Sequence, residues 1–205
     1  MYIQKEREEV KMSVTFSYSS MNAGKSLLLL KAKHDYESVG KRVVCLTPSI
    51  NTRDGEGVIK SRALKESIPA IKIKAESNLY SMINTSNSLD KISLILIDEA
   101  QFLTKEQVKQ LCDISDLLGI HVMCFGLRTD SNGDLFEGSG TLLALADKLV
   151  EVKNTCHCGK KATMTLRVDS TGAIIKNGEQ IKIGAEDSYV SVCRKHWVAD
   201  NTGLK

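Results

Sequence analysis

The stretch Ser13–Ser26, SVTFSYSSMNAGKS, decides the fold of this chain. Its first six residues form an apolar run that leads into a turn of small residues, a pattern that predicts a buried strand. A segment rich in Leu and Lys follows from Lys25 to about Val39 and is stopped by Gly40. A glycine just after the last residue of such a segment is typical of a helix end. The stretch therefore predicts a strand, a turn and a helix in succession.

The turn has the spacing of a phosphate-binding loop, which is a small residue, four others, and then Gly-Lys-Ser. Backbone N–H groups of such a loop point at phosphates. Lys25 would neutralise the β- and γ-phosphates of ATP, and Ser26 would ligate Mg²⁺. Ser19 replaces the usual glycine, so we expect strain if that position needs a positive φ. The predicted ATP and Mg²⁺ contacts in the loop are Ser19, Ser20, Met21, Asn22, Ala23, Gly24, Lys25 and Ser26.

Two carboxylates, Asp98 and Glu99, close the apolar segment Ser93–Ile97. An acid at the end of a buried strand is the second half of a phosphate-loop nucleotide site, where Asp98 would hold Mg²⁺. Glu99 is the next residue, so its side chain points elsewhere and could take a proton from an attacking hydroxyl or water. The two motifs predict ATP binding and leave the acceptor open.

The other apolar segments alternate with helical ones, which predicts an α/β fold with a mainly parallel sheet and helices on both faces. Thr104 and Gln107 form a predicted capping box, and Gly119 stops that helix. The further predicted helices are Lys105–Leu118 and Thr141–Ala146. The further predicted strands are Arg42–Thr47, Ile68–Ile73, His121–Gly126 and Lys148–Val152.

The last quarter of the chain contains two short metal-binding patterns. Cys156 and Cys158 form one, and Cys193 and His196 form the other. Three thiolates and one imidazole suit a tetrahedral structural Zn²⁺ site, whereas His157 lies between two ligands and is the poorer choice. Short predicted strands at Thr163–Val168, Ile174–Ile183 and Tyr189–Val192 surround these patterns. We therefore expect an N-terminal arm (1–12), a phosphate-loop α/β domain (13–152) and a small β-rich zinc-binding domain (153–205).

Composition limits the remaining function classes. The 205 residues include 42% apolar and 26% charged residues, and the formal net charge is only +3. This balance gives no argument for a nucleic-acid partner or an anionic membrane. No apolar run approaches the ~20 residues that span a bilayer, and the cytoplasm is the expected location. Cys45, Cys112 and Cys124 stand singly in apolar stretches and are expected to be buried thiols.

Taken together, the motifs resemble those of the zinc-containing cellular and bacterial thymidine kinases. The matching segments are YSSMNAGKS, LILIDEAQFL, GLRTD with GDLF, CHCGKKA and IGAEDSYVSVCRKH, and they extend from about Ser13 to His196. The resemblance implies transfer of the ATP γ-phosphate to the 5′-hydroxyl of thymidine, with deoxyuridine as a second acceptor. It also implies a homotetramer in pyrimidine salvage, inhibited by the end product dTTP.

The resemblance also assigns roles to single residues. Glu99 would be the base, Lys25 and Arg53 would stabilise the transferring phosphate, and Gln101 would belong to the ATP and Mg²⁺ site. A lasso-like loop would close over the thymine. The implied substrate contacts are Phe102, Phe136, Gln180, Ile181, Lys182, Ile183, Gly184 and Tyr189.

Ser131 departs from the family pattern, which has an aromatic residue there, so one wall of the base pocket is expected to differ. Two other functions fit parts of the sequence. Asp98-Glu99-Ala100-Gln101 resembles a helicase box of an ATP-driven motor, although such motors normally need two ATPase domains. A zinc-ribbon module that holds nucleotide only as a switch is the other alternative.

Overall fold

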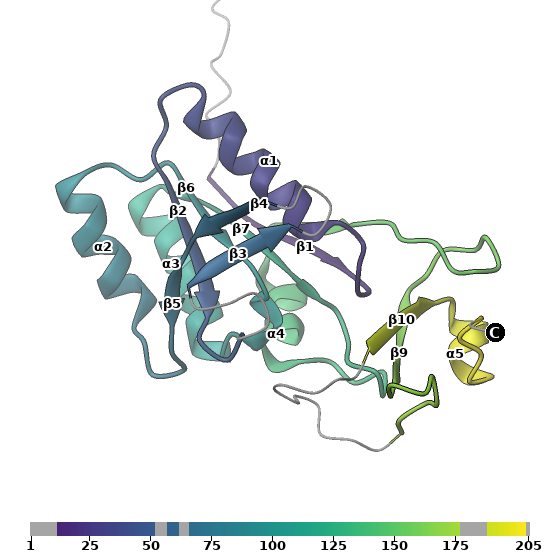
Figure 1. Cartoon of the computed structure of the whole chain (residues 1–205). Coiled ribbons are helices and arrows are strands. Elements are labelled where there is room, and N and C mark those ends of the chain that lie inside the picture. The colour runs from purple at the N-terminus through teal and green to yellow at the C-terminus, as the bar shows by residue number, and fades with distance from the viewer. Residues whose placement is uncertain (1–11, 52–56, 62–65, 177–187, 204–205) are drawn as a thin grey trace, which may run out of the picture.

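The computed structural model describes residues 12–51, 57–61, 66–176 and 188–203 (Figure 1). Its centre is a six-stranded sheet in the order β5-β2-β6-β7-β1-β8, and all neighbouring strands in it run parallel. The strands are β1 (Val14–Ser19), β2 (Val43–Pro48), β5 (Ile71–Ile73), β6 (Leu94–Ile97), β7 (His121–Leu127) and β8 (Lys148–Glu151). The predicted α/β class is confirmed.

Helices cover both faces of this sheet, because its strands β2, β6 and β7 carry buried or partly buried apolar side chains on both sides (Figure 1). On one face, α2 (Leu79–Leu89), α3 (Lys105–Leu118) and α4 (Glu137–Leu145) bury a large core that includes Phe16, Ile95 and Val122. On the other face, α1 (Lys25–Glu37) packs with the hairpin β3 (Val58–Ser61)–β4 (Glu66–Pro69) over a second cluster. The parallel strands place their carboxyl ends at one edge, where ligands of such sheets bind.

The start of α3 matches the sequence prediction in detail. Thr104 accepts a hydrogen bond from the backbone N–H of Gln107, and the Gln107 side chain accepts one from the backbone N–H of Thr104. Gly119, with φ 64°, ends the helix in the left-handed conformation. The reciprocal bonds satisfy two backbone donors that a helix start otherwise leaves unpaired.

Three elements differ from the sequence prediction. The expected strand at Ile68–Ile73 is two strands, since β4 pairs with β3 while β5 joins the edge of the main sheet. Pro69 separates them, because a proline has no N–H with which to continue a ladder. The helix expected at Thr141 begins earlier, at Glu137, and its Gly138 allows close packing against η1 (Ala100–Phe102). Helix α2 was not expected, since its polar sequence is stabilised by Leu79 and Ile83 packing into the core.

The C-terminal segment forms a small lobe beside this core, which we call the zinc lobe after its Cys/His cluster. It contains the antiparallel pair β9 (Met164–Val168) and β10 (Ser188–Val192), followed by α5 (Arg194–Val198). Of the expected strand at Ile174–Ile183, the described part begins with Ile174, which forms a bridge with Val168. The domain division at residue 153 stays a prediction. No helix of the described residues is long and apolar enough to cross a bilayer.

Candidate active site and metal centre

The phosphate loop connects β1 to α1 through a turn with two left-handed residues. Asn22 has φ 58° and Gly24 has φ 85°. A Cβ at Gly24 would meet nothing within 4 Å, so the backbone angle and not the space favours glycine there. Ser19 is the last residue of β1 and has no positive φ, so the strain considered for this serine does not arise.

The side chain of Lys25 lies back over the loop that precedes it. Its Nζ donates to Ser19 Oγ over 2.9 Å and to the backbone carbonyl of Ser20 over 3.2 Å. Ser19 therefore supplies a hydroxyl partner for the ammonium group that the usual glycine lacks. The positive charge is held at the N-terminus of α1, where the helix dipole also favours an anion.

Ser26 and Asp98 join the two halves of the site. Ser26 Oγ donates to Asp98 Oδ2 over 3.4 Å, although the residues are 72 positions apart in the chain. Asp98 is 3% exposed and directly follows β6, which is separated from β1 by β7 alone. A hydroxyl and a carboxylate oxygen are ligands that Mg²⁺ prefers, so the donor set fits this ion.

Glu99 stands at the turn that leaves β6, with a left-handed backbone of φ 51°. Its carboxylate accepts a hydrogen bond of 2.5 Å from Nε2 of Gln101 in the short helix η1 (Ala100–Phe102). The side-chain oxygen Oε1 of the buried Gln101 accepts a hydrogen bond of 3.0 Å from the backbone N–H of Leu127. Gln101 thus fixes Glu99 relative to the end of β7.

Next to this carboxylate, five apolar side chains form one cluster. Met21, Leu127 and Phe136 are buried, and Phe102 and Tyr189 pack against them. The rings of Phe102 and Phe136 meet edge to face with centroids 5.7 Å apart. The structure thus brings together three residues predicted to contact the substrate. Leu127 was not predicted, and Met21, predicted as an ATP contact, has its side chain in this cluster.

The zinc lobe holds the phosphate loop through the backbone carbonyl of Met21. Asn154 Nδ2 donates to this oxygen over 2.8 Å, and Ser191 Oγ donates to it over 2.6 Å. Ser20 Oγ in turn donates to the carbonyl of Ala162 over 3.4 Å. Sequence reasoning missed Asn154 and Ser191, because no motif marks a polar side chain that bonds to a distant backbone group.

Other predicted residues lie elsewhere. Arg53 and the lasso residues 180–184 are outside the described residues. Ser131, which replaces the family's aromatic residue, accepts a hydrogen bond at its carbonyl from Trp197 Nε1 over 2.9 Å. The Trp197 ring also lies against Gly133, where an added Cβ would come within 3.3 Å of it. A side chain of α5 therefore supports the turn before Phe136.

The four predicted metal ligands converge. One ligand atom from each of Cys156, Cys158, Cys193 and His196 lies within 4.8 Å of all the others. The Sγ atoms of Cys158 and Cys193 are 3.9 Å apart, and His196 Nδ1 is 3.3 and 3.6 Å from those of Cys156 and Cys193. Tetrahedral zinc gives S···S of about 3.8 Å and S···N of about 3.6 Å from its usual bond lengths. The cluster fits Zn²⁺.

Two features beside the cluster support metal binding. Burial raises the pKa of the Cys156 thiol, but hydrogen bonds from the Cys158 backbone and the His196 ring outweigh it and lower the pKa to about 6. The thiolate is the form that binds metal. The rings of His157 and His196 are stacked with their centroids 4.2 Å apart. His157 is not one of the four ligands, but its ring supports the ring of the ligand His196.

Comparisons with known proteins agree with this geometry. The thymidine kinase family model matches residues 12–197. A thymidine kinase of Idiomarina loihiensis is 50% identical over 90% of this chain and 95% of its own length. One from Rhizobium meliloti is 49% identical over 89% of this chain and 94% of its own length. A chain from a solved structure of Pif1 helicases matches with a TM-score of only 0.40 and 19% identity, covering 69% of this chain and 40% of its own, which carries no argument. This chain belongs to the thymidine kinase family.

Proposed function

We propose that this protein transfers the γ-phosphate of ATP to the 5′-hydroxyl of thymidine and so makes dTMP for pyrimidine salvage. The observation that carries the proposal is the contact between Ser26 and Asp98, because it joins the phosphate loop to the acidic strand end. Glu99 directly follows Asp98 in the chain, and the apolar cluster around Phe102 includes Met21 of the phosphate loop. These contacts support a site in which a triphosphate, Mg²⁺, the base Glu99 and the apolar cluster would meet at the carboxyl ends of the strands.

On the donor side, Lys25 and the backbone N–H groups at the start of α1 bind the β- and γ-phosphates. Ser26 and Asp98 would hold Mg²⁺, which neutralises charge that develops on the phosphate oxygens. Lys25 is already positioned by Ser19 Oγ and the Ser20 carbonyl. Arg53 takes its role as a second phosphate-stabilising cation from the family resemblance alone.

On the acceptor side, Glu99 removes the proton of the sugar hydroxyl as it attacks the phosphorus. Gln101 orients this carboxylate through the 2.5 Å hydrogen bond. Phe102 and Phe136 offer aromatic surfaces to the thymine, with Tyr189 at the side of the zinc lobe. Residues 180–184 would close over the base, as the lasso of the family does. Positioning and electrostatics supply most of the rate in such a transfer.

The zinc ion would be structural, because protein ligands fill all four positions. It would hold α5 against β9 and thereby keep Asn154 and Ser191 on the phosphate loop. A cytoplasmic homotetramer inhibited by dTTP is also proposed, from the family resemblance. Light scattering of the purified protein and inhibition assays with dTTP test these last two points.

The decisive experiment incubates the protein with Mg·ATP and each deoxynucleoside in turn and analyses the products by chromatography. We expect dTMP from thymidine and a smaller amount of dUMP from deoxyuridine. Glu99→Gln keeps the shape but removes the base, so turnover should fall by ~10²–10⁴ while ATP binding is kept. Unchanged turnover would remove Glu99 from this role. ATP hydrolysis stimulated by single-stranded DNA, without dTMP, would favour a motor instead.

A further inference from the structure

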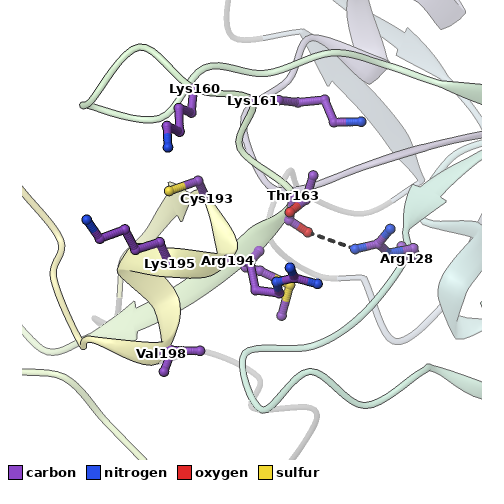
Figure 2. Close-up of a pocket in the computed structure, with 9 residues that line it drawn as sticks. Arg128, Lys160, Lys161, Thr163, Cys193, Arg194, Lys195 and Val198 are labelled. Carbon is purple, nitrogen blue, oxygen red and sulfur yellow. Dashed lines mark hydrogen bonds between the residues drawn. The ribbon is translucent and has the colours of Figure 1, made fainter.

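A hollow with a strongly basic lining lies between the 160–163 segment and α5, beside the zinc cluster (Figure 2). Its volume is about 750 Å³, which is within the range of small-molecule sites. Neither Lys25 nor Ser26 lines it. The hollow therefore does not include the two side chains proposed to act on the ATP phosphates, although its 160–163 segment contacts the phosphate loop through the bond from Ser20 to the Ala162 carbonyl.

Five cationic side chains line this hollow and no acidic side chain does. They are Arg128, Lys160, Lys161, Arg194 and Lys195. They come from three separate parts of the chain, the end of β7, the loop before β9 and the start of α5 (Figure 2). Lys160, Lys161, Arg194 and Lys195 are exposed, so water and salt screen much of their mutual repulsion, and an anion between them would remove the rest.

Neighbouring acids do little to offset this charge. Lys161 forms an ion pair of 2.7 Å with Glu151. Arg128 donates to the backbone carbonyl of Thr163 over 3.1 Å, which fixes the arginine without neutralising it (Figure 2). Within the described parts of the chain, Lys160, Arg194 and Lys195 have no ion-pair partner. Among the described residues, four of the five positive charges have no acidic partner, and the zinc-loaded cluster of three thiolates, whose Cys193 lines the hollow, adds one negative charge, which leaves about three.

The positive charge of the whole chain is also concentrated in its C-terminal part. Residues 153–205 contain nine Lys and Arg and five Asp and Glu, a formal charge of +4. The first 152 residues carry −1, since the whole chain has a formal charge of +3. The basic character of the protein is therefore concentrated in the zinc lobe, where the hollow lies.

We propose that this hollow is a second anion site, which binds an oligophosphate chain such as a triphosphate. A triphosphate carries about four negative charges at neutral pH, which is enough to neutralise the remaining positive charge of the lining, and guanidinium and ammonium groups are the usual partners of phosphate. Met164 and Val198 add apolar surface to the lining. This surface could hold the base of a nucleoside triphosphate, so the source of the phosphate chain is either inorganic or a nucleotide.

The experiment uses the full-length zinc-loaded protein with Lys25→Ala, which disables the phosphate loop. Tripolyphosphate is titrated into it by calorimetry, and we expect saturable binding with one site per chain. Adding Lys160→Gln and Lys195→Gln should weaken this binding roughly tenfold or more, since each removes an ionic contact to phosphate. Zinc content and circular dichroism check that each variant is folded.

A second basic hollow provides the matched control. Lys41 and Lys91 line it together with Arg42, but Glu37 and Asp90 line it too. The pair Lys41→Gln and Lys91→Gln removes the same charge from a hollow in which two acids stand beside three cations, so tripolyphosphate binding should change less than twofold. An equal loss in both pairs would show only a general effect of net charge and would overturn the proposal.

Two further outcomes decide the matter. Absence of saturable binding in the Lys25→Ala protein would overturn the proposal. So would a single-stranded oligonucleotide that binds these lysines and is not displaced by tripolyphosphate, because it would make the surface a nucleic-acid site. Within a positive result, dATP that binds more tightly than tripolyphosphate assigns the site to nucleotides. Equal affinities assign it to the phosphate chain alone.

Discussion

Adding one methyl group at Gly138, in α4, should destabilise the protein and disturb the active site. A Cβ at this position would lie 2.6 Å from the carbonyl oxygen of Ala100, 2.8 Å from that of Leu103 and 2.9 Å from that of Gln101. All three are backbone atoms of η1 or of the residue after it, so no flexible side chain can move aside. Either α4 or η1 must shift.

The expected size of the effect follows from these contacts. Overpacking of a buried position costs about 1–3 kcal/mol of unfolding free energy. For a chain of this length each kcal/mol corresponds to roughly 2–4 °C in melting temperature, so Gly138→Ala should melt about 2–12 °C lower. Because η1 carries Gln101 and Phe102, the kcat/KM for thymidine should fall as well.

Gly140 lies in the same helix and provides the control. A Cβ there would meet only the side chain of Leu135, at 3.8 Å and beyond. Replacing a glycine inside a helix by alanine stabilises it by about 0.5–1 kcal/mol, so Gly140→Ala should melt slightly higher and keep full activity. Calorimetric melting curves and initial-rate assays measure both variants. Equal stabilisation by the two alanines would refute the close approach of α4 to η1.

Three further predictions follow from contacts at the site and the metal centre. Gln101→Leu removes the hydrogen bond that orients Glu99, so kcat should fall at least ~10-fold. The same change leaves the buried N–H of Leu127 without its acceptor, so the unfolding free energy measured in urea titrations should fall by about 1–3 kcal/mol. Trp197→Phe loses the bond to the Ser131 carbonyl, worth about 0.5–1.5 kcal/mol, together with the packing of the larger indole ring against Gly133. The KM for thymidine should therefore rise ~2–10-fold while kcat and the KM for ATP stay constant in steady-state assays. Zinc content measured after dialysis should be full at pH 8 and fall on acidification, because protons compete with the metal for the three thiolates and the imidazole. Bound zinc keeps the thiolates deprotonated, so release should begin below the pKa of about 6 that the metal-free Cys156 thiol has; zinc already lost at pH 7 would contradict this.

The sequence predicted the central sheet and the phosphate loop because their signals are local. The run before Ser19, the Gly-Lys-Ser turn and the capping box at Thr104 each depend on residues within one or two turns of chain. The wider site depends on contacts between distant segments. Asn154 belongs to the site because it bonds to the Met21 carbonyl, and Leu127 because it packs in the apolar cluster. Neither contact leaves a periodic pattern in the sequence.

The glycines of α4 show that local sequence preference also misplaced the start of a helix. Gly138 and Gly140 stand before the predicted helix Thr141–Ala146, since glycine in a helix costs free energy. The structure places both in α4, because a side chain at Gly138 would not fit against η1. Tertiary packing therefore overrode the local preference, and helix α2 was missed for a related reason, since buried Leu79 and Ile83 outweigh its polar composition.

The two bonds to the Met21 carbonyl have a consequence for the timing of synthesis. Their donors, Asn154 and Ser191, lie 133 and 170 positions later in the chain. A growing polypeptide emerges from the ribosome N-terminal part first, so the nucleotide loop is among the first segments made and among the last to reach its final form. A nascent chain that lacks its last few dozen residues would already contain all strands of the sheet. It would still lack Ser191 on the Met21 carbonyl and Tyr189 in the apolar cluster, so the proposed site for ATP and the nucleoside would be incomplete.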